Sequence, residues 1–171
     1  MESHPGGGSC FKLTLPFNIF ESKIVEEKQI KPKTSVWDGP KLHLLFVEDN
    51  PINMTYNKAI CRKLGFSGMF VENGLACLAA LEQQTFDLIL MDIQMPVMNG
   101  EEALKKIREK EEGASAHQPV IALTAYSLRQ DRERFLENGF DGYISKPVDI
   151  NLFIEEIKRC LLNLVEATLS P

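Results

Sequence analysis

The chain has 171 residues, of which 44% are hydrophobic and 25% charged. That length holds one ordinary domain with roughly 30 to 50 residues to spare, and the composition is typical of globular rather than disordered or fibrous proteins. The net charge of -5 falls entirely after residue 40, because residues 1–40 carry five lysines against five acidic residues. An acidic globular region argues against binding to nucleic acid, since duplex DNA needs a basic face.

The chain shows no signal for export or membrane insertion. The N-terminal residues lack a basic region followed by an apolar one, and no apolar stretch nears the ~20 residues of a membrane-spanning helix. We therefore expect a cytoplasmic segment without membrane contact. The cysteines form no Cys-x-x-Cys pair, so we expect reduced thiols rather than a metal site; they are Cys10, Cys61, Cys77 and Cys160.

Residues 18–40 are predicted to be a linker, because a Glu- and Lys-rich stretch, Pro32, Gly39 and Pro40 interrupt any apolar periodicity. From Lys41 onward, short apolar runs alternate with helix-period segments. Continuously apolar runs are typical of parallel strands covered on both faces. The predicted strands are Leu42–Val47, Gly68–Val71, Phe86–Met91, Pro119–Leu123 and Gly142–Ser145.

The helices between the strands begin at recognisable caps. Asn50 followed by Pro51 predicts one start, and capping boxes that begin at Asn99 and Ser127 predict two more. The first helix is expected to bury a face made of Ile52, Tyr56, Ala59, Ile60 and Leu64. The last helix is expected to bury Ile150, Phe153, Ile154, Ile157, Leu161 and Leu164.

Five alternating units with right-handed crossovers predict an α/β fold: a flavodoxin-like, doubly wound five-stranded parallel sheet, (βα)5, with strand order 2-1-3-4-5. Ligands of such sheets bind at the carboxyl ends of the strands. The residues expected there are Glu48, Asp49, Asp92, Thr124 and Lys146.

These residues together favour phosphoryl chemistry. Three carboxylates at one edge repel one another unless a cation neutralises them, and hard oxygen ligands favour Mg²⁺. Asp92 can act as a nucleophile toward a phosphoryl group, while Lys146 and Thr124 can stabilise charge on the phosphoryl oxygens. Each of these features has an ordinary explanation when it occurs alone: an acidic pair can stabilise a helix dipole, an Asp can form a turn, and a Lys can be a solvated surface charge. Their joint placement at four strand ends favours a phosphoryl-transfer site.

Four segments of the chain resemble the receiver domain of two-component response regulators, over about Lys41 to Leu164. They are Leu45–Asn53, Met91–Gly100, Ala122–Ala125 and Gly142–Pro147. The resemblance implies that Asp92 accepts phosphate from a phosphohistidine and that Lys146 pairs with that phosphate. It also implies a Mg²⁺ site made of Glu48, Asp49, Asp92 and the backbone carbonyl of Gln94.

The same resemblance implies a conformational response. Thr124 and Tyr143 would form a switch pair, the Lys146-Pro147 peptide would be cis, and the altered surface would run from about Leu128 to Leu164. Tyr126 would flank the path of hydrolytic water and shield the acyl phosphate.

The residues of these motifs resemble those of receiver domains attached to hybrid sensor histidine kinases. The Gly-x-Gly-Ser-x-Phe and Leu-Pro pattern within residues 1–17 resembles the closing strand region of a histidine-kinase ATPase domain. The implied domains are an ATPase remnant (1–17), the linker (18–40), the receiver (41–165) and a tail (166–171). The parent kinase would be a membrane-anchored phosphotransferase. This chain itself lacks the His box and the ATP-binding motifs of such a kinase. The resemblance implies that a receiver catalyses only its own phosphorylation and dephosphorylation.

The implied partner is a histidine kinase dimerisation and phosphotransfer domain or a histidine phosphotransfer protein, and the sequence leaves a homodimer open. A stand-alone single-domain response regulator is the main alternative. A flavodoxin-like electron carrier is disfavoured because Glu48 and Asp49 would repel the phosphate of its cofactor. A phosphatase with an aspartyl nucleophile would place an acid two residues after Asp92, where this chain has Gln94.

Overall fold

The structure is a computed structural model, and it describes residues 2–4, 8–10, 37–113, 117–125 and 129–169. The chain divides into two compact units, Met1–Lys33 and Thr34–Pro171. In the first unit, strands β1 (Glu2–His4) and β2 (Gly8–Cys10) pair antiparallel, with Ser3 opposite Ser9. An ATPase remnant at this end of the chain stays a prediction.

The second unit is built on five parallel strands. They are β3 (His43–Val47), β4 (Ser67–Val71), β5 (Leu88–Asp92), β6 (Val120–Thr124) and β7 (Gly142–Ser145). Their order in the sheet is β4-β3-β5-β6-β7, which is 2-1-3-4-5 when these strands are counted along the chain. The predicted flavodoxin-like sheet is therefore confirmed.

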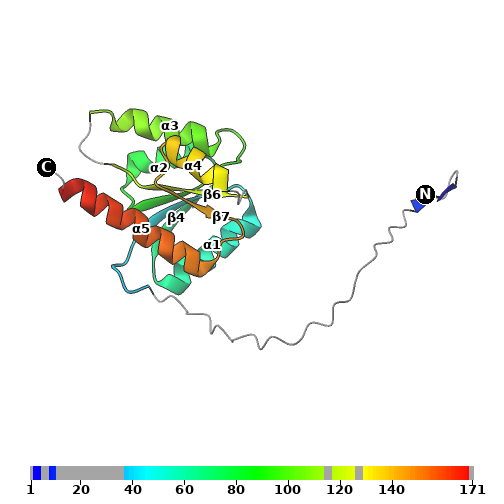
Figure 1. The fold of residues 1–171 in the computed structure, drawn as a ribbon, viewed down its shortest axis with the longest axis horizontal. Coiled ribbons are helices and arrows are strands. Elements are labelled where there is room, and N and C mark those ends of the chain that lie inside the picture. The colour runs from blue at the N-terminus through cyan, green and yellow to red at the C-terminus, as the bar shows by residue number, and fades with distance from the viewer. Residues whose placement is uncertain (1, 5–7, 11–36, 114–116, 126–128, 170–171) are drawn as a thin grey trace. The chain divides into compact units, whose positions relative to one another are not determined.

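Helices cover both faces of this sheet (Figure 1). On one face lie α1 (Pro51–Leu64) and α5 (Ile150–Leu169). On the other lie α2 (Gly74–Gln83), α3 (Gly100–Glu111) and α4 (Arg129–Glu137). Side chains alternate along each strand, so Leu44 and Phe46 pack toward α1 and α5 while Leu45 and Val47 pack toward α2, α3 and α4.

Two predicted helix starts are confirmed by their hydrogen bonds. The Asn50 side chain accepts from the backbone N–H of Ile52 at 2.9 Å. At α3, the Asn99 side chain accepts from Glu102 N at 2.8 Å, and Glu102 Oε2 accepts from Asn99 N at 3.2 Å, which completes the capping box. Ser127, the third predicted cap, lies outside the described residues.

The predicted buried face of α1 is largely wrong. Ile52 is 78% and Tyr56 47% exposed, and Ala59 is exposed as well. The buried residues of α1 are Met54, Asn57, Ile60 and Cys61. A polar residue, Asn57, therefore stands in the buried face while apolar ones point outward, so hydrophobic periodicity selects the wrong side of the helix. For α5 the prediction is confirmed at Phe153, Ile154 and Ile157, which are buried. Ile150 and Leu161 are partly buried against the same core, and the side chain of Leu164 lies outside the described residues.

Trp37 joins the start of this unit to α5 and to Phe66, which lies between α1 and β4. Its ring packs edge-on against Phe66 with centroids 5.1 Å apart, and its indole N–H donates to the carbonyl of Pro40 at 2.8 Å. Lys158 of α5 lies 5.8 Å from the ring centroid and pairs with Asp38 at 2.5 Å. The last residues of the predicted linker thus pack against α5 and the segment before β4.

Candidate functional site

The carboxyl ends of the central strands open into one cleft. The loop after β3 contributes Glu48 and Asp49, β5 ends at Asp92, β6 ends at Thr124, and Lys146 follows β7 directly. The cleft has a volume of about 220 Å³, and its walls contain all five residues. The sequence predicts that these side chains lie together, because parallel strands have their carboxyl ends at the same edge of a sheet.

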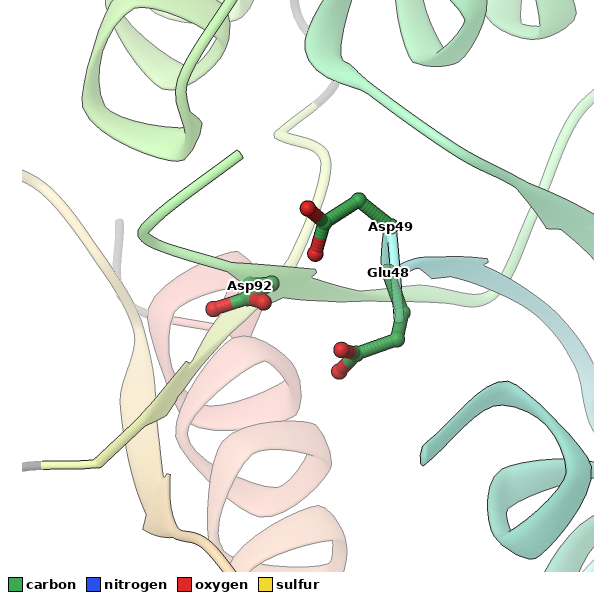
Figure 2. A group of neighbouring side chains, drawn as sticks. All are labelled: Glu48, Asp49 and Asp92. Atoms are coloured by element: carbon green, nitrogen blue, oxygen red, sulfur yellow. The ribbon is translucent and has the colours of Figure 1, made fainter. Parts of the chain in front are cut away.

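Three carboxylates face one another in this cleft. Figure 2 shows Glu48 and Asp49 leaving consecutive positions after β3, with Asp92 opposite them at the end of β5. One oxygen from each carboxylate lies within 4.8 Å of the others. Glu48 is 1% and Asp92 6% exposed, whereas Asp49 is open to solvent. The donor set contains only oxygen, which suits Mg²⁺ better than softer metals.

Lys146 bridges the two buried carboxylates. Its Nζ lies 2.6 Å from Asp92 Oδ2 and 2.7 Å from Glu48 Oε2. Its backbone N–H donates to the carbonyl of Thr124 at 2.7 Å, and the Lys146-Pro147 peptide is cis. The two ion pairs hold the ammonium against the end of β5.

The pKa of Asp92 is raised above its ordinary value. Burial is the main cause, because it disfavours the charged carboxylate, and the nearby charge of Glu48 acts in the same direction. Lys146 and the backbone N–H of Gln94, which donates to Asp92 Oδ1 at 3.2 Å, lower the pKa but do not cancel the rise. A cation placed among the carboxylates would favour the ionised form of Asp92.

Asn53 is a site residue to which sequence reasoning assigned no role. Its Nδ2 donates to Glu48 Oε1 at 2.8 Å, and the residue also lines the cleft. The hydrogen bond orients Glu48, whose other oxygen is paired with Lys146. The available signal was an amide side chain in the first turn of the helix that follows the acidic pair, where it can turn back toward the strand end.

The loop after β5 packs tightly against Asp92. The N–H of Gly100 donates to the carbonyl of Ile93 at 3.0 Å, and a Cβ at Gly100 would collide with the carbonyl oxygen of Asp92. Glycine at this position therefore lets α3 begin directly against the strand end. In the same loop Val97 has a φ of 71° and is 78% exposed, a conformation that β-branched residues rarely adopt.

The other residues predicted for the site differ in how much the structure shows of them. Thr124 is 2% exposed and lines the cleft. Tyr143 lies beside Ala122 in the sheet and is partly buried on the side covered by α2, α3 and α4. Gln94 lines the cleft, and its carbonyl as a metal ligand stays a prediction. Tyr126 lies outside the described residues.

The sequence profile of the response regulator receiver domain matches residues 44–158. The chain belongs to this family. It contains a receiver domain of the two-component phosphorelay type, and this receiver has the flavodoxin-like fold described above.

Two relatives differ in the share of their length that this chain matches. The hybrid signal transduction histidine kinase I of Dictyostelium discoideum is 37% identical over 128 residues, which are 72% of this chain but 7% of that protein. The polar-differentiation response regulator DivK of Brucella anthropi is 39% identical over 118 residues, 69% of this chain and 94% of that protein. The chain thus spans a small part of one relative and nearly all of the other.

Two solved structures are similar to this receiver. The receiver domain of sensor histidine kinase PA1611 from Pseudomonas aeruginosa PAO1, with a magnesium ion coordinated in its active site cleft, has 38% identity and a TM-score of 0.61 over 70% of this chain and 97% of its own. A co-crystal structure from Saccharomyces cerevisiae contains the histidine phosphotransfer protein Ypd1 and the receiver domain of Ssk1. It has 32% identity and a TM-score of 0.63 over 70% of this chain and 88% of that one.

Among the helices of the described residues, none combines the length and apolar character needed to cross a membrane.

Proposed function

We propose that Asp92 is the phosphoacceptor of this receiver and takes a phosphoryl group from a phosphohistidine. One Asp92 oxygen would form the new bond to phosphorus while the phosphorus–nitrogen bond to the imidazole breaks. The imidazole nitrogen keeps the electron pair of that bond and takes up a proton from solvent. The observation that carries the proposal is the position of Asp92, a nearly buried carboxylate at the floor of the cleft with the Lys146 ammonium 2.6 Å away.

The three carboxylates fit a Mg²⁺ ion. Glu48, Asp49 and Asp92 would hold it, together with the backbone carbonyl of Gln94, and Asn53 would keep Glu48 oriented. When bound, Mg²⁺ neutralises charge on the cluster and on the phosphoryl oxygens. Lys146 would pair with a second phosphoryl oxygen and the Thr124 hydroxyl with a third. The magnesium-bound PA1611 receiver supports this assignment.

Phosphorylation would alter the surface formed by α4, β7 and α5. Thr124 at the cleft would move toward the phosphoryl group, and Tyr143 on the neighbouring strand would turn inward into the space released. A phosphoryl group adds charge and acceptor oxygens at one end of the sheet. Partners would thus read a change that begins at Asp92 and reaches α5.

The phosphodonor would be a histidine phosphotransfer protein or the dimerisation and phosphotransfer domain of a kinase, in the cytoplasm. The Ssk1 receiver, solved with Ypd1, supports the first form of donor. The Dictyostelium relative, together with the ATPase-like pattern in residues 1–17, supports an origin in a hybrid sensor histidine kinase. The almost full coverage of DivK supports a stand-alone regulator instead. Sequencing the transcript upstream of the Met1 codon separates the two, because only the hybrid kinase has an ATPase domain there.

Labelling with acetyl phosphate tests the phosphoacceptor. The chain should gain the mass of one phosphoryl group in the presence of Mg²⁺, and Asp92→Asn should abolish the gain. Asp87→Asn is the matched control, because Asp87 precedes the same strand at its opposite end and is exposed. Among the contacts described, its carboxylate accepts only from the His43 N–H. Labelling without Mg²⁺, or labelling that survives Asp92→Asn, would refute the assignment.

A further inference from the structure

A second pocket lies beside the acidic cleft, between α1 and the turn that joins β7 to α5. Its volume is about 240 Å³, and its exposed walls are largely apolar. The hydroxyl of Tyr56 donates to the carbonyl of Val148 at 2.9 Å, which links the two sides of the pocket. The lining residues are Glu48, Ile52, Asn53, Tyr56, Asn57, Lys146, Pro147 and Val148.

Asn57 gives this pocket an unused hydrogen-bond donor. The residue is 2% exposed and lines the pocket, and its Nδ2 has no hydrogen-bond partner among the residues that the structure describes. Buried polar groups in folded proteins nearly always have a partner, because burial without one is unfavourable. A polar side chain on the buried face of α1 therefore needs an acceptor that the described chain does not supply.

Each of the other polar side chains that line the pocket already has a partner. The Asn53 amide donates to Glu48, the Glu48 carboxylate pairs with Lys146, and the Tyr56 hydroxyl donates to Val148. An ionic ligand would therefore lose its hydration without meeting an unpaired charge. A water molecule needs two to four polar partners, which mostly apolar walls provide poorly.

We infer that this pocket binds a small neutral molecule with an apolar body and one hydrogen-bond acceptor, which accepts from Asn57 Nδ2. The body would pack on Ile52, Pro147 and Val148. The pocket is smaller than those that hold drug-sized ligands, so the ligand is compact. Because Glu48 and Lys146 line both this pocket and the acidic cleft, the ligand would contact the far side of two proposed phosphorylation residues.

A pair of nearly isosteric probes tests the inference on the full chain. Acetophenone carries a carbonyl acceptor and ethylbenzene does not. In a ¹⁵N-labelled sample, acetophenone should shift the Asn57 side-chain amide and the backbone signals of Ile52 and Val148 in a saturable manner. It should bind about fivefold more tightly than ethylbenzene, the ratio that one added hydrogen bond provides.

Asn57→Leu removes the donor at nearly constant shape and should abolish this preference while leaving ethylbenzene binding in place. Leu162→Ser, an exposed apolar residue elsewhere on α5, is the control and should change neither affinity. Equal affinities in the unaltered chain would overturn the inference even if Asn57→Leu does not fold. The inference would also be overturned if the NMR shifts caused by acetophenone do not saturate, or if Asn57→Leu still binds acetophenone more tightly than ethylbenzene. It would be overturned as well if these residues shift only when a phosphotransfer protein is added in place of the small molecules.

Discussion

The ammonium of Lys146 lies 2.6 Å from the carboxylate of Asp92, at the point where β5 and β7 end. The same ammonium lies 2.7 Å from Glu48, so one cation balances two buried anions. Removing the cation leaves both buried carboxylates uncompensated. The fold's stability is therefore tied to the charge balance at its strand ends.

Lys146→Ala should destabilise the receiver by about 3 kcal/mol in the absence of divalent cations, because breaking a buried ion pair leaves unpaired charge. Mg²⁺ should recover part of this loss, since it would take over the compensation of the carboxylates. Urea unfolding with and without MgCl₂ measures both effects. Lys110→Ala is the control: Lys110 pairs with Glu82 on the surface, and its loss should cost under about 1 kcal/mol. Equal losses in the two variants would contradict the expectation.

Asp92→Asn should change the pH dependence of stability without Mg²⁺. The pKa of Asp92 is raised in the folded chain by burial, so folding is favoured by the protonated form, and this contribution is lost as pH rises through the raised pKa. Asparagine stays neutral throughout. The variant should therefore gain stability relative to the parent as pH rises above the ordinary aspartate pKa, until Asp92 of the parent is fully ionised in the folded chain. Urea unfolding across this range gives the difference, and a gain that shrinks as pH rises would have the wrong sign.

Gly100→Ala should destabilise the receiver by about 2 kcal/mol or more, because the added methyl group collides with the backbone of Asp92. Labelling by acetyl phosphate should slow as well, since the strand end that carries Asp92 must shift. Gly113→Ala separates collision from backbone conformation. Gly113 has a φ of 83° and no neighbour near an added Cβ, so its cost should be about 1 kcal/mol with labelling unchanged. Thermal unfolding ranks the two variants.

Val97→Asn should stabilise the receiver by about 1 kcal/mol, because Val97 has a φ of 71° and asparagine tolerates the left-handed region better than a β-branched residue does. Val97 is 78% exposed, so little packing is lost with its side chain. Val97→Thr keeps the β-branch and should bring no gain. A melting temperature that rises equally in both variants would assign the effect to the loss of an exposed apolar side chain instead of to backbone conformation.

Much of the fold and of the site could be predicted from the sequence, because both depend on local patterns that repeat. The apolar runs predicted the strands of the sheet. A polar residue directly after a strand is expected at the carboxyl edge of the sheet, and Glu48 and Lys146 lie there. The caps at Asn50 and Asn99 depend on neighbours in sequence and were predictable for the same reason.

The buried face of α1 and the role of Asn53 were not predictable in this way. Asn57 is buried where α1 approaches the turn after β7, a contact made across the fold. Asn53 meets Glu48 only five residues away, but apolar periodicity and capping patterns do not mark an amide that turns back toward the strand end. Ile52 and Tyr56 remain exposed because they lie at the mouth of that pocket. Hydrophobic periodicity assumes that buried positions are apolar, and α1 departs from that assumption at Asn57.

Trp37 is the only tryptophan of the chain, and its place against Phe66 and Lys158 gives the protein an intrinsic optical reporter. Its fluorescence reports on the contact between the segment that precedes the receiver and α5, the helix expected to respond to phosphorylation. A version of the protein that begins at Lys41 would lose both this contact and the signal. Emission recorded before and after addition of beryllofluoride can therefore follow α5 in the unaltered chain without an attached dye.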